Sequence, residues 1–162
     1  MELAANPDAI ITLTVNRYLS VTQGTMVTAR ANPDVTSALV ADAGNRISRK
    51  SNNSFEITGG DPHGNNPLVL RIEVLPAESY AAVGLIVKNV NNVSEGGITS
   101  WDSMNVGNGA HDNSVTVTDK APLPQGTQSI TYELYMLIRP KANAADYPVG
   151  DIGLIDPRIS NF

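Results

Sequence analysis

Two histidines, His63 and His111, are the side chains whose type and spacing best suit chemistry in this chain. His63 follows Asp61 in the segment DPHGNN, and His111 precedes Asp112 in NGAHDN. Imidazole and carboxylate together can hold a transition metal, or form a nucleophilic triad with a serine. Neither segment contains G-x-S-x-G, H-E-x-x-H or a phosphate-binding loop, and no alternating Asp/Asn run of the calcium-loop kind occurs. We therefore predict exposed loop histidines, no metal, no cofactor and no enzymatic activity.

Paired carboxylates are a second catalytic arrangement, because glycoside hydrolysis needs two carboxyl groups that face each other across a cleft. Glu73 and Glu133 lie in strand-like segments, but on the face opposite to the apolar residues. They stand beside Arg71 and Arg139 there. This placement predicts solvated carboxylates or cross-strand ion pairs rather than a pair of catalytic acids.

Trp101 is the one tryptophan of the chain, and it lies between Asn91 and Asn113, where Asn, Gly, Ser and Asp predominate. We predict that this 91–113 segment is the longest irregular loop. A tryptophan there either covers one end of the fold or is displayed as a stacking surface for a sugar or a partner. We favour the covering role. In the displayed arrangement, Trp101 would bind the ligand together with Asp102 and Asn105.

Composition narrows the range of partners. The 162 residues include 11 basic and 16 acidic side chains, and the net charge of -5 is unsuited to a nucleic-acid groove. Arg46, Arg49 and Lys50 form the one basic cluster, which we interpret as a solvated loop or edge. No apolar run approaches the ~20 residues that span a bilayer, and the first ten residues lack the features of a signal peptide. The absence of cysteine leaves the compartment undecided.

Alternation of apolar and polar residues is the main structural signal, and it is clearest in QSITYELYMLIRP at 128–140. Its apolar positions fall on one side of a period of two, which is typical of a β-strand with one buried face. Similar patterns, ended by turn residues or proline, predict further strands at 9–29 (two or three strands), 55–58, 68–75, 80–90 and 113–119. Residues 34–41 follow a turn and fit a strand, although their Ala, Leu and Asp residues also permit a short helix. The residues expected to face inward in two of these are Leu68, Leu70, Ile72 and Val74, and Ala81, Val83, Leu85 and Val87.

Strands separated by turn clusters, with no helical pattern between them, favour antiparallel sheets over βαβ units. We predict an all-β fold: a single antiparallel β-sandwich of seven to nine strands, immunoglobulin-like or jelly-roll, formed by one domain over residues 1–162. The ends at 1–8 and 156–162 are expected to be mobile or to dock on a partner. Asp156-Pro157 interrupts the last segment, because proline cannot donate to a strand ladder.

The first predicted strand lies close to the chain terminus, and its apolar stripe consists of Ile11, Leu13 and Val15. A terminal strand of this kind either pairs within its own sheet or completes the sheet of a neighbouring subunit. Pairing within the chain is the simpler arrangement. The same three residues are nevertheless the candidate assembly strand.

A resemblance to a family rests on three features together: the Thr- and Val-rich strand at 10–15, the Asn/Gly loops, and a late strand followed by PKANAADYPVGDIGL. These resemble immunoglobulin-like surface subunits of bacteria, including pilin-type proteins, in which a phrase such as AADYPVGD commonly leads into the last strand. The resemblance covers roughly a third of the chain and implies a structural β-sandwich subunit. After Gly150 the sequence departs from it, since DIGLIDPRISNF replaces a long alternating strand.

The sequence therefore predicts a non-enzymatic structural subunit of a repetitive assembly, either a pilus-like surface filament or a virion shell or tail decoration. Its partners would be copies of itself or other subunits, with no nucleic acid and no membrane span. Its location would be extracellular, on the cell surface or in a virion. The alternative is a carbohydrate- or ligand-binding module that uses the 91–113 loop.

Overall fold

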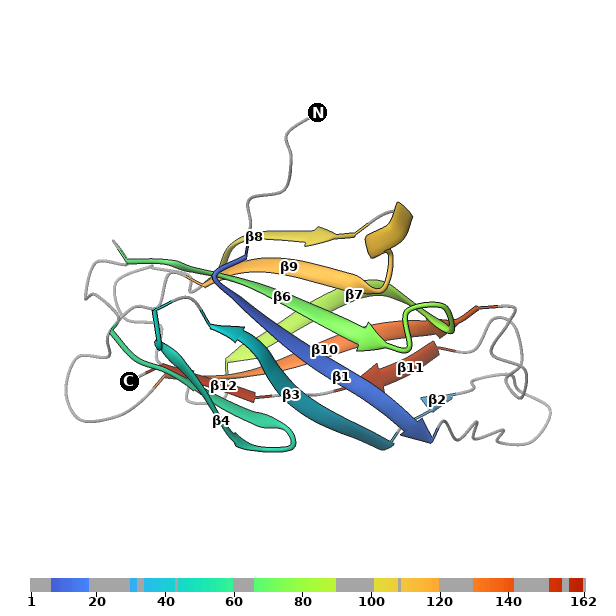
Figure 1. Cartoon of the computed structure of the whole chain (residues 1–162), viewed down its shortest axis with the longest axis horizontal. Coiled ribbons are helices and arrows are strands. Elements are labelled where there is room, and N and C mark those ends of the chain that lie inside the picture. The colour runs from blue at the N-terminus through green and yellow to red at the C-terminus, as the bar shows by residue number, and fades with distance from the viewer. Residues whose placement is uncertain are drawn as a thin grey trace.

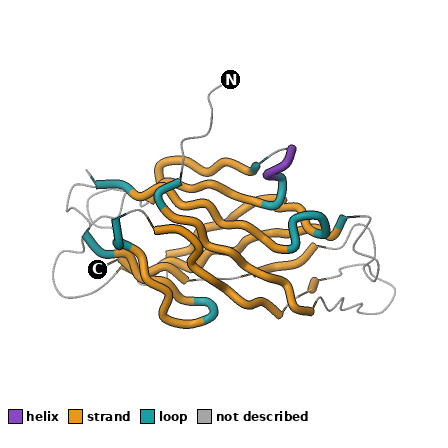
Figure 2. Tube along the Cα trace, viewed as in Figure 1, coloured by secondary structure: helices purple, strands orange, loops and turns teal. Residues whose placement is uncertain are grey.

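The computed structural model describes residues 7–17, 30–31, 34–42, 44–59, 66–89, 101–107, 109–119, 130–141, 152–155 and 158–161. Within these ranges the chain forms twelve β-strands, one 3-10 turn, η1 (Gly109–His111), and no α-helix. Strand conformation accounts for most of the described trace (Figure 2). The prediction of an all-β fold is confirmed.

Five strands form the first sheet (Figure 1). In spatial order they are β3 (Asp34–Asp42), β1 (Ala9–Arg17), β6 (Leu68–Leu75), β9 (Ser114–Asp119) and β8 (Trp101–Val106). β1 pairs antiparallel with β3 and parallel with β6. The first strand of the chain is therefore an interior strand of its sheet, while β3 and β8 are the edges.

Seven strands form the second sheet, which is built around β10. β7 pairs with one side of β10, and the last two strands of the chain, β11 and β12, pair with the other side. β2 lies beyond β11, and β5 and then β4 lie beyond β12. The bounds are β2 (Arg30–Ala31), β4 (Ile47–Ser51), β5 (Ser54–Ile57), β7 (Tyr80–Asn89), β10 (Ile130–Pro140), β11 (Ile152–Ile155) and β12 (Arg158–Asn161).

β11 and β12 lie end to end along the same side of β10. Ile155 is opposite Met136, and Arg158 is opposite Glu133. From the first pair to the second, the sequence advances by three residues on one side and goes back by three residues on β10, so both antiparallel pairings share one register. The interruption of the final segment was predicted from its Asp-Pro pair. The segment 158–161, however, lies between β10 and β5 in the same sheet rather than in a free tail.

Three strand pairs are parallel: β1 with β6, β2 with β11, and β5 with β12. The prediction of purely antiparallel sheets is therefore wrong. Hairpin connections make neighbouring strands alternate in direction, whereas strands joined through long stretches of chain are free of this constraint. Each of the three parallel pairs joins strands that are far apart in the sequence.

Both sheets contribute side chains to one buried cluster. Phe55 and Met136 of the seven-stranded sheet are fully buried in it, as are Ile11 and Leu13 of the five-stranded sheet, at no more than 1% exposure. Burying each large aliphatic side chain contributes roughly 1.5 to 3 kcal/mol. β6 alternates as predicted, and its buried residues are Leu68, Leu70, Ile72 and Val74.

The inner face of β7 differs from the predicted one. Ala81 and Leu85 are buried as predicted, but Tyr80 and Ala82 are buried as well, and Val83 is 44% exposed. The side chain of Val87 lies outside the described residues. The register with β10 shifts at this point, because Val83 has no opposite residue of its own. A β-bulge of this kind reverses the alternation of the residues after it. The prediction that Val83 faces inward is therefore wrong.

The described residues contain more strands than the seven to nine predicted. β2, β11 and β12 have only two to four residues each, which is too few for an alternating pattern to be visible. β8 was missed because WDSMNV has no apolar period, and its strand conformation comes from pairing with β9. The prediction of an irregular loop over 91–113 is wrong for residues 101–106.

Asp8 holds the start of β1 on β6. Its backbone N–H donates to the Val69 carbonyl oxygen at 2.8 Å, and its carboxylate accepts from the Val69 N–H at 2.8 Å. Asp8, within the end that was predicted to be mobile, is thus paired within the chain. The remainder of the predicted mobile end, residues 1–6, lies outside the described residues.

We expect Leu13→Ala to lower the free energy of unfolding by about 2 to 5 kcal/mol, because it leaves a cavity between the two sheets. Thr14→Ala, on the half-buried opposite side of β1, should cost less than about 1 kcal/mol. Urea unfolding of both variants measures the difference. Equal losses would show that β1 does not anchor the core through its Leu13 face.

Candidate functional site

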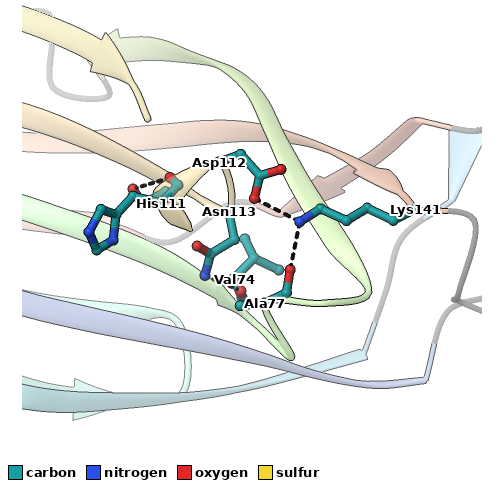
Figure 3. A network of polar contacts seen from close by, with 7 residues as sticks. Val74, Ala77, His111, Asp112, Asn113 and Lys141 are labelled. Carbon is teal, nitrogen blue, oxygen red and sulfur yellow. Dashed lines mark hydrogen bonds and ion pairs between the residues drawn. The ribbon is translucent and has the colours of Figure 1, made fainter. Parts of the chain in front are cut away.

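A polar network joins the two sheets where the end of β10 meets the connection between β8 and β9 (Figure 3). Lys141, directly after β10, donates from Nζ to Asp112 Oδ1 at 2.7 Å and to the Ala77 carbonyl oxygen at 2.8 Å. The side chains of Lys141 and Asp112 are 28% and 38% exposed. Water therefore screens part of this ion pair. The main effect of the pair is to position the end of β10 and the β8–β9 connection relative to each other.

Backbone hydrogen bonds extend the same network. The Ala82 N–H, in edge strand β7, donates to the Asp112 carbonyl oxygen at 2.8 Å. The Lys141 N–H donates to the Ser79 carbonyl oxygen, also at 2.8 Å. Asp112 thus links the connection of the five-stranded sheet to the edge of the seven-stranded sheet through its main chain and its side chain.

Asn113, which is buried, fixes the position of Asp112. Its Nδ2 donates to the Val74 carbonyl oxygen at 2.8 Å, and its own carbonyl oxygen accepts from the Val74 N–H at 2.9 Å. Gly107 lies so close to the His111 carbonyl oxygen that a Cβ at Gly107 would clash with it. Residues 109–113 of the β8–β9 connection are therefore bonded to β6 through Asn113 and packed closely against Gly107.

Arg46, at the start of β4, is a second centre of polar contacts. It is half-buried and donates to the carbonyl oxygens of Thr58, Gly59, Asn66 and Pro67 at 2.8 to 3.3 Å. These four residues flank the segment 60–65, so Arg46 joins the two ends of that segment. The basic cluster lies at an edge strand as predicted, but Arg46 is a clamp rather than a solvated charge.

The predicted binding residues Trp101, Asp102 and Asn105 lie on edge strand β8. Trp101 is opposite Asp119 of β9, and Ser103 is opposite the adjacent residue, Thr118. Asp102 therefore has no opposite residue and is the extra residue of a bulge. The strand brings the three predicted residues together along one sheet edge. Asp119, at the end of β9, is fully buried.

The candidate assembly strand lies inside the chain's own core. Ile11, Leu13 and Val15 are 1%, 1% and 8% exposed, and β1 has a neighbouring strand on each side. The structure therefore shows the intramolecular pairing that the sequence analysis considered the simpler one.

Of the two histidine segments, only the one that contains His111 lies in the described part of the chain. His63 and Asp61 lie outside the described residues. His111 is exposed, and Figure 3 shows its ring pointing away from the Asp112–Lys141 pair. No group of three or more His, Cys, Asp or Glu side chains that could hold a metal ion occurs among the described residues.

The acidic residue Glu73 is in the ion pair that the sequence suggested. Arg71 NH1 lies 3.4 Å from Glu73 Oε1, and both side chains are half-buried. The two residues are two positions apart in β6, so the pair lies within one strand rather than across strands.

Sequence reasoning missed the polar contacts of Asn113 and Lys141, and it considered Asp112 only as a possible metal ligand or triad member beside His111. Their partners are distant in the sequence: Lys141 is 29 residues from Asp112, and Asn113 is 39 from Val74. No local spacing indicates such pairs.

Comparison with models of protein families finds no match to this chain. The curated proteins and the solved structures with which it was compared also include no match. Within the described ranges, no helix is long and apolar enough to cross a membrane. Any functional assignment must therefore come from the residues and geometry of the chain itself.

We expect Lys141→Met to lower the free energy of unfolding by about 1 kcal/mol, because the ion pair with Asp112 is partly screened by water. Without Lys141, Asp112 loses one of its anchors, so amide hydrogen exchange at Ala82 should accelerate about fivefold. The control is Arg139→Met, which changes an exposed residue of β10, the strand that ends directly before Lys141. If both variants change Ala82 exchange equally, Lys141 does not position Asp112.

Proposed function

We propose that the protein is a non-enzymatic structural subunit of a repetitive assembly, built as a single β-sandwich domain. The assembly is a surface filament of the pilus kind, outside the cell, or the shell or tail of a virion. Its partners are copies of the same chain or other subunits. The observation that carries this proposal is that the first strand of the chain, β1, is an interior strand of its sheet.

An interior strand that comes first among the strands can be supplied by another copy with its contacts preserved. All the other described strands follow β1 in the sequence, so the β1 of a neighbouring copy can take the same register between β3 and β6. This exchange of an identical element is a low-cost route to assembly. When every copy donates its strand to the next one, the result is an open, repetitive chain of subunits.

The contacts of β1 are strong enough to join two subunits. Burial of Ile11, Leu13 and Val15 contributes on the order of 5 kcal/mol before the cost of ordering the strand. Backbone pairing on both sides of β1 adds directional hydrogen bonds. These terms are the same within one chain and between two chains, so the linker and the concentration decide which arrangement is populated.

Engineered disulfides test the exchange directly, because the chain has no cysteine of its own. Ile10 of β1 and Arg71 of β6 are register partners, so the pair Ile10→Cys and Arg71→Cys can form a disulfide in either arrangement. If β1 is exchanged, oxidation of concentrated protein should give a ladder of covalent oligomers in a non-reducing gel. If β1 stays in its own chain, oxidation gives a cross-linked monomer only.

The matched control keeps Arg71→Cys and pairs it with Thr116→Cys on β9. Arg71 and Thr116 are also register partners, but β9 is in the middle of the chain, so their disulfide forms within one chain in both arrangements. A cross-linked monomer for both pairs at every protein concentration would contradict exchange of β1. A ladder for both pairs would indicate non-specific oxidation.

A second candidate function, binding of a carbohydrate or another ligand, is favoured by the bulge at Asp102. Bulges on sheet edges often redirect side chains beside binding sites. Here the bulge is on β8, which is an edge strand, and it lies directly after Trp101. An aromatic ring and the two polar residues Asp102 and Asn105 on one edge are suitable for stacking on a sugar and hydrogen bonding to it.

Trp101 offers a specific readout for this candidate, because it is the only tryptophan. Titration with a panel of glycans should shift its fluorescence, and Asn105→Ala should weaken binding by about 1 to 2 kcal/mol, or roughly 5- to 30-fold. A Trp101 emission that does not respond to any glycan in the panel would reject carbohydrate binding at β8.

A further inference from the structure

The two longest edge strands, β3 and β7, each have a partner strand on one side only among the described residues. β3 pairs with β1, and β7 pairs with β10. The other side of such a strand presents N–H and C=O groups that can pair with a strand of another molecule. What occupies these groups therefore determines whether two subunits can join edge to edge.

On β3, the side chain of Asn52 occupies the groups that an added strand would use. Asn52 Oδ1 accepts from the Ser37 N–H at 2.9 Å, and Asn52 Nδ2 donates to the Val35 carbonyl oxygen at 2.8 Å. A carboxamide has the same donor and acceptor as a peptide group. The Val35 C=O and the Ser37 N–H flank Thr36 on the free side of β3, so Asn52 substitutes for one residue of a neighbouring strand.

Further contacts hold the Asn52 carboxamide in place. Arg49 donates from its guanidinium to Asn52 Oδ1 at 2.9 Å and to Ser37 Oγ at 3.0 Å. Ser37 is buried, at 4% exposure. Asn52 belongs to the turn between β4 and β5 of the seven-stranded sheet, so one sheet covers the edge of the other.

The opposite pair of edges shows the reciprocal arrangement. Asp112, from the β8–β9 connection of the five-stranded sheet, accepts from the Ala82 N–H of β7 in the seven-stranded sheet. Since β10 lies on the other side of β7, this N–H points to the free side of the edge. Lys141 anchors Asp112 there.

Both edges are also bulged close to these contacts. Val40 is an extra residue of β3 in its pairing with β1, and Val83 is an extra residue of β7 in its pairing with β10. They are the large hydrophobic residues that the structure exposes within its described ranges, at 63% and 44%. A bulge twists an edge away from the flat geometry that another strand requires.

We propose that Asn52 and Asp112 are edge plugs, which close β3 and β7 against pairing with a strand of a second copy of this chain. Each plug is supplied by the opposite sheet and lies near a bulge of the edge that it covers. The proposal does not depend on exchange of β1, because it concerns the free edges of a folded subunit. Removal of Asn52 opens the β3 edge.

Asn52→Ala tests the plug with little disturbance of the turn. Among the described non-glycine residues, a positive φ occurs at Asn45 and not at Asn52. Alanine at position 52 therefore meets no backbone strain. The expected result is amide hydrogen exchange at Ser37 that is at least about tenfold faster. Light scattering over a concentration series should also show a higher mass than that of the wild type at equal concentration.

Asn53→Ala is the matched control, because Asn53 lies in the same turn but its side chain bonds within the turn, accepting a hydrogen bond from Ser51 Oγ. It should leave both the Ser37 exchange rate and the mass unchanged. A double variant, Asn52→Ala with Val40→Lys, places a charge on the opened edge and should return the mass to that of the wild type.

Three outcomes would overturn the proposal. The first is a wild-type mass for Asn52→Ala at every concentration. The second is association that Val40→Lys does not reduce, since it would involve another surface. The third is a higher mass for Asn53→Ala as well.

If Asn52→Ala does not fold, Asn52→Ser, whose hydroxyl cannot reach both Val35 and Ser37, takes its place in the same measurements. All masses are compared with the wild type. The difference in mass therefore reports association through the β3 edge, whether or not β1 is exchanged.

Discussion

Burial of β1 between β3 and β6 is the constraint on which the five-stranded sheet depends. β1 is the strand that pairs with β3, so without β1 the β3 strand has no ladder, and the Asn52 carboxamide has no ordered edge to bind. β1 also places Ile11 and Leu13 in the buried cluster to which both sheets contribute. The core, the edge and the contact between sheets on this side of the molecule therefore all rely on one terminal strand.

The first and the last of the described strands are both interior strands. β1 lies between β3 and β6, and β12 lies between β10 and β5. Each is held by two ladders, one antiparallel and one parallel. An interior strand has more pairing and burial than a strand at an edge. The exchange of β1 proposed above relies on these contacts.

The polar contacts between the sheets have a different physical role from the apolar core. The pair formed by Lys141 and Asp112 is partly exposed, so it contributes little to global stability. The Asn52 carboxamide is exposed as well. These contacts occupy main-chain groups at the sheet edges, and what they determine is the specificity of pairing. Apolar burial makes the fold stable, whereas a few hydrogen bonds decide which edges are open to other molecules.

The sequence by itself determined the all-β class, the long strands and the buried faces of strands such as β6, because each follows from an alternation of period two within a few residues. It did not show β8, whose strand conformation comes from pairing with β9, nor the bulge at Val83, which depends on the register with β10. The parallel pairs and the contacts of Asn52 and Lys141 were likewise decided by tertiary structure. They join residues that are distant along the chain, and local pattern carries no information on which distant backbone group a side chain will meet.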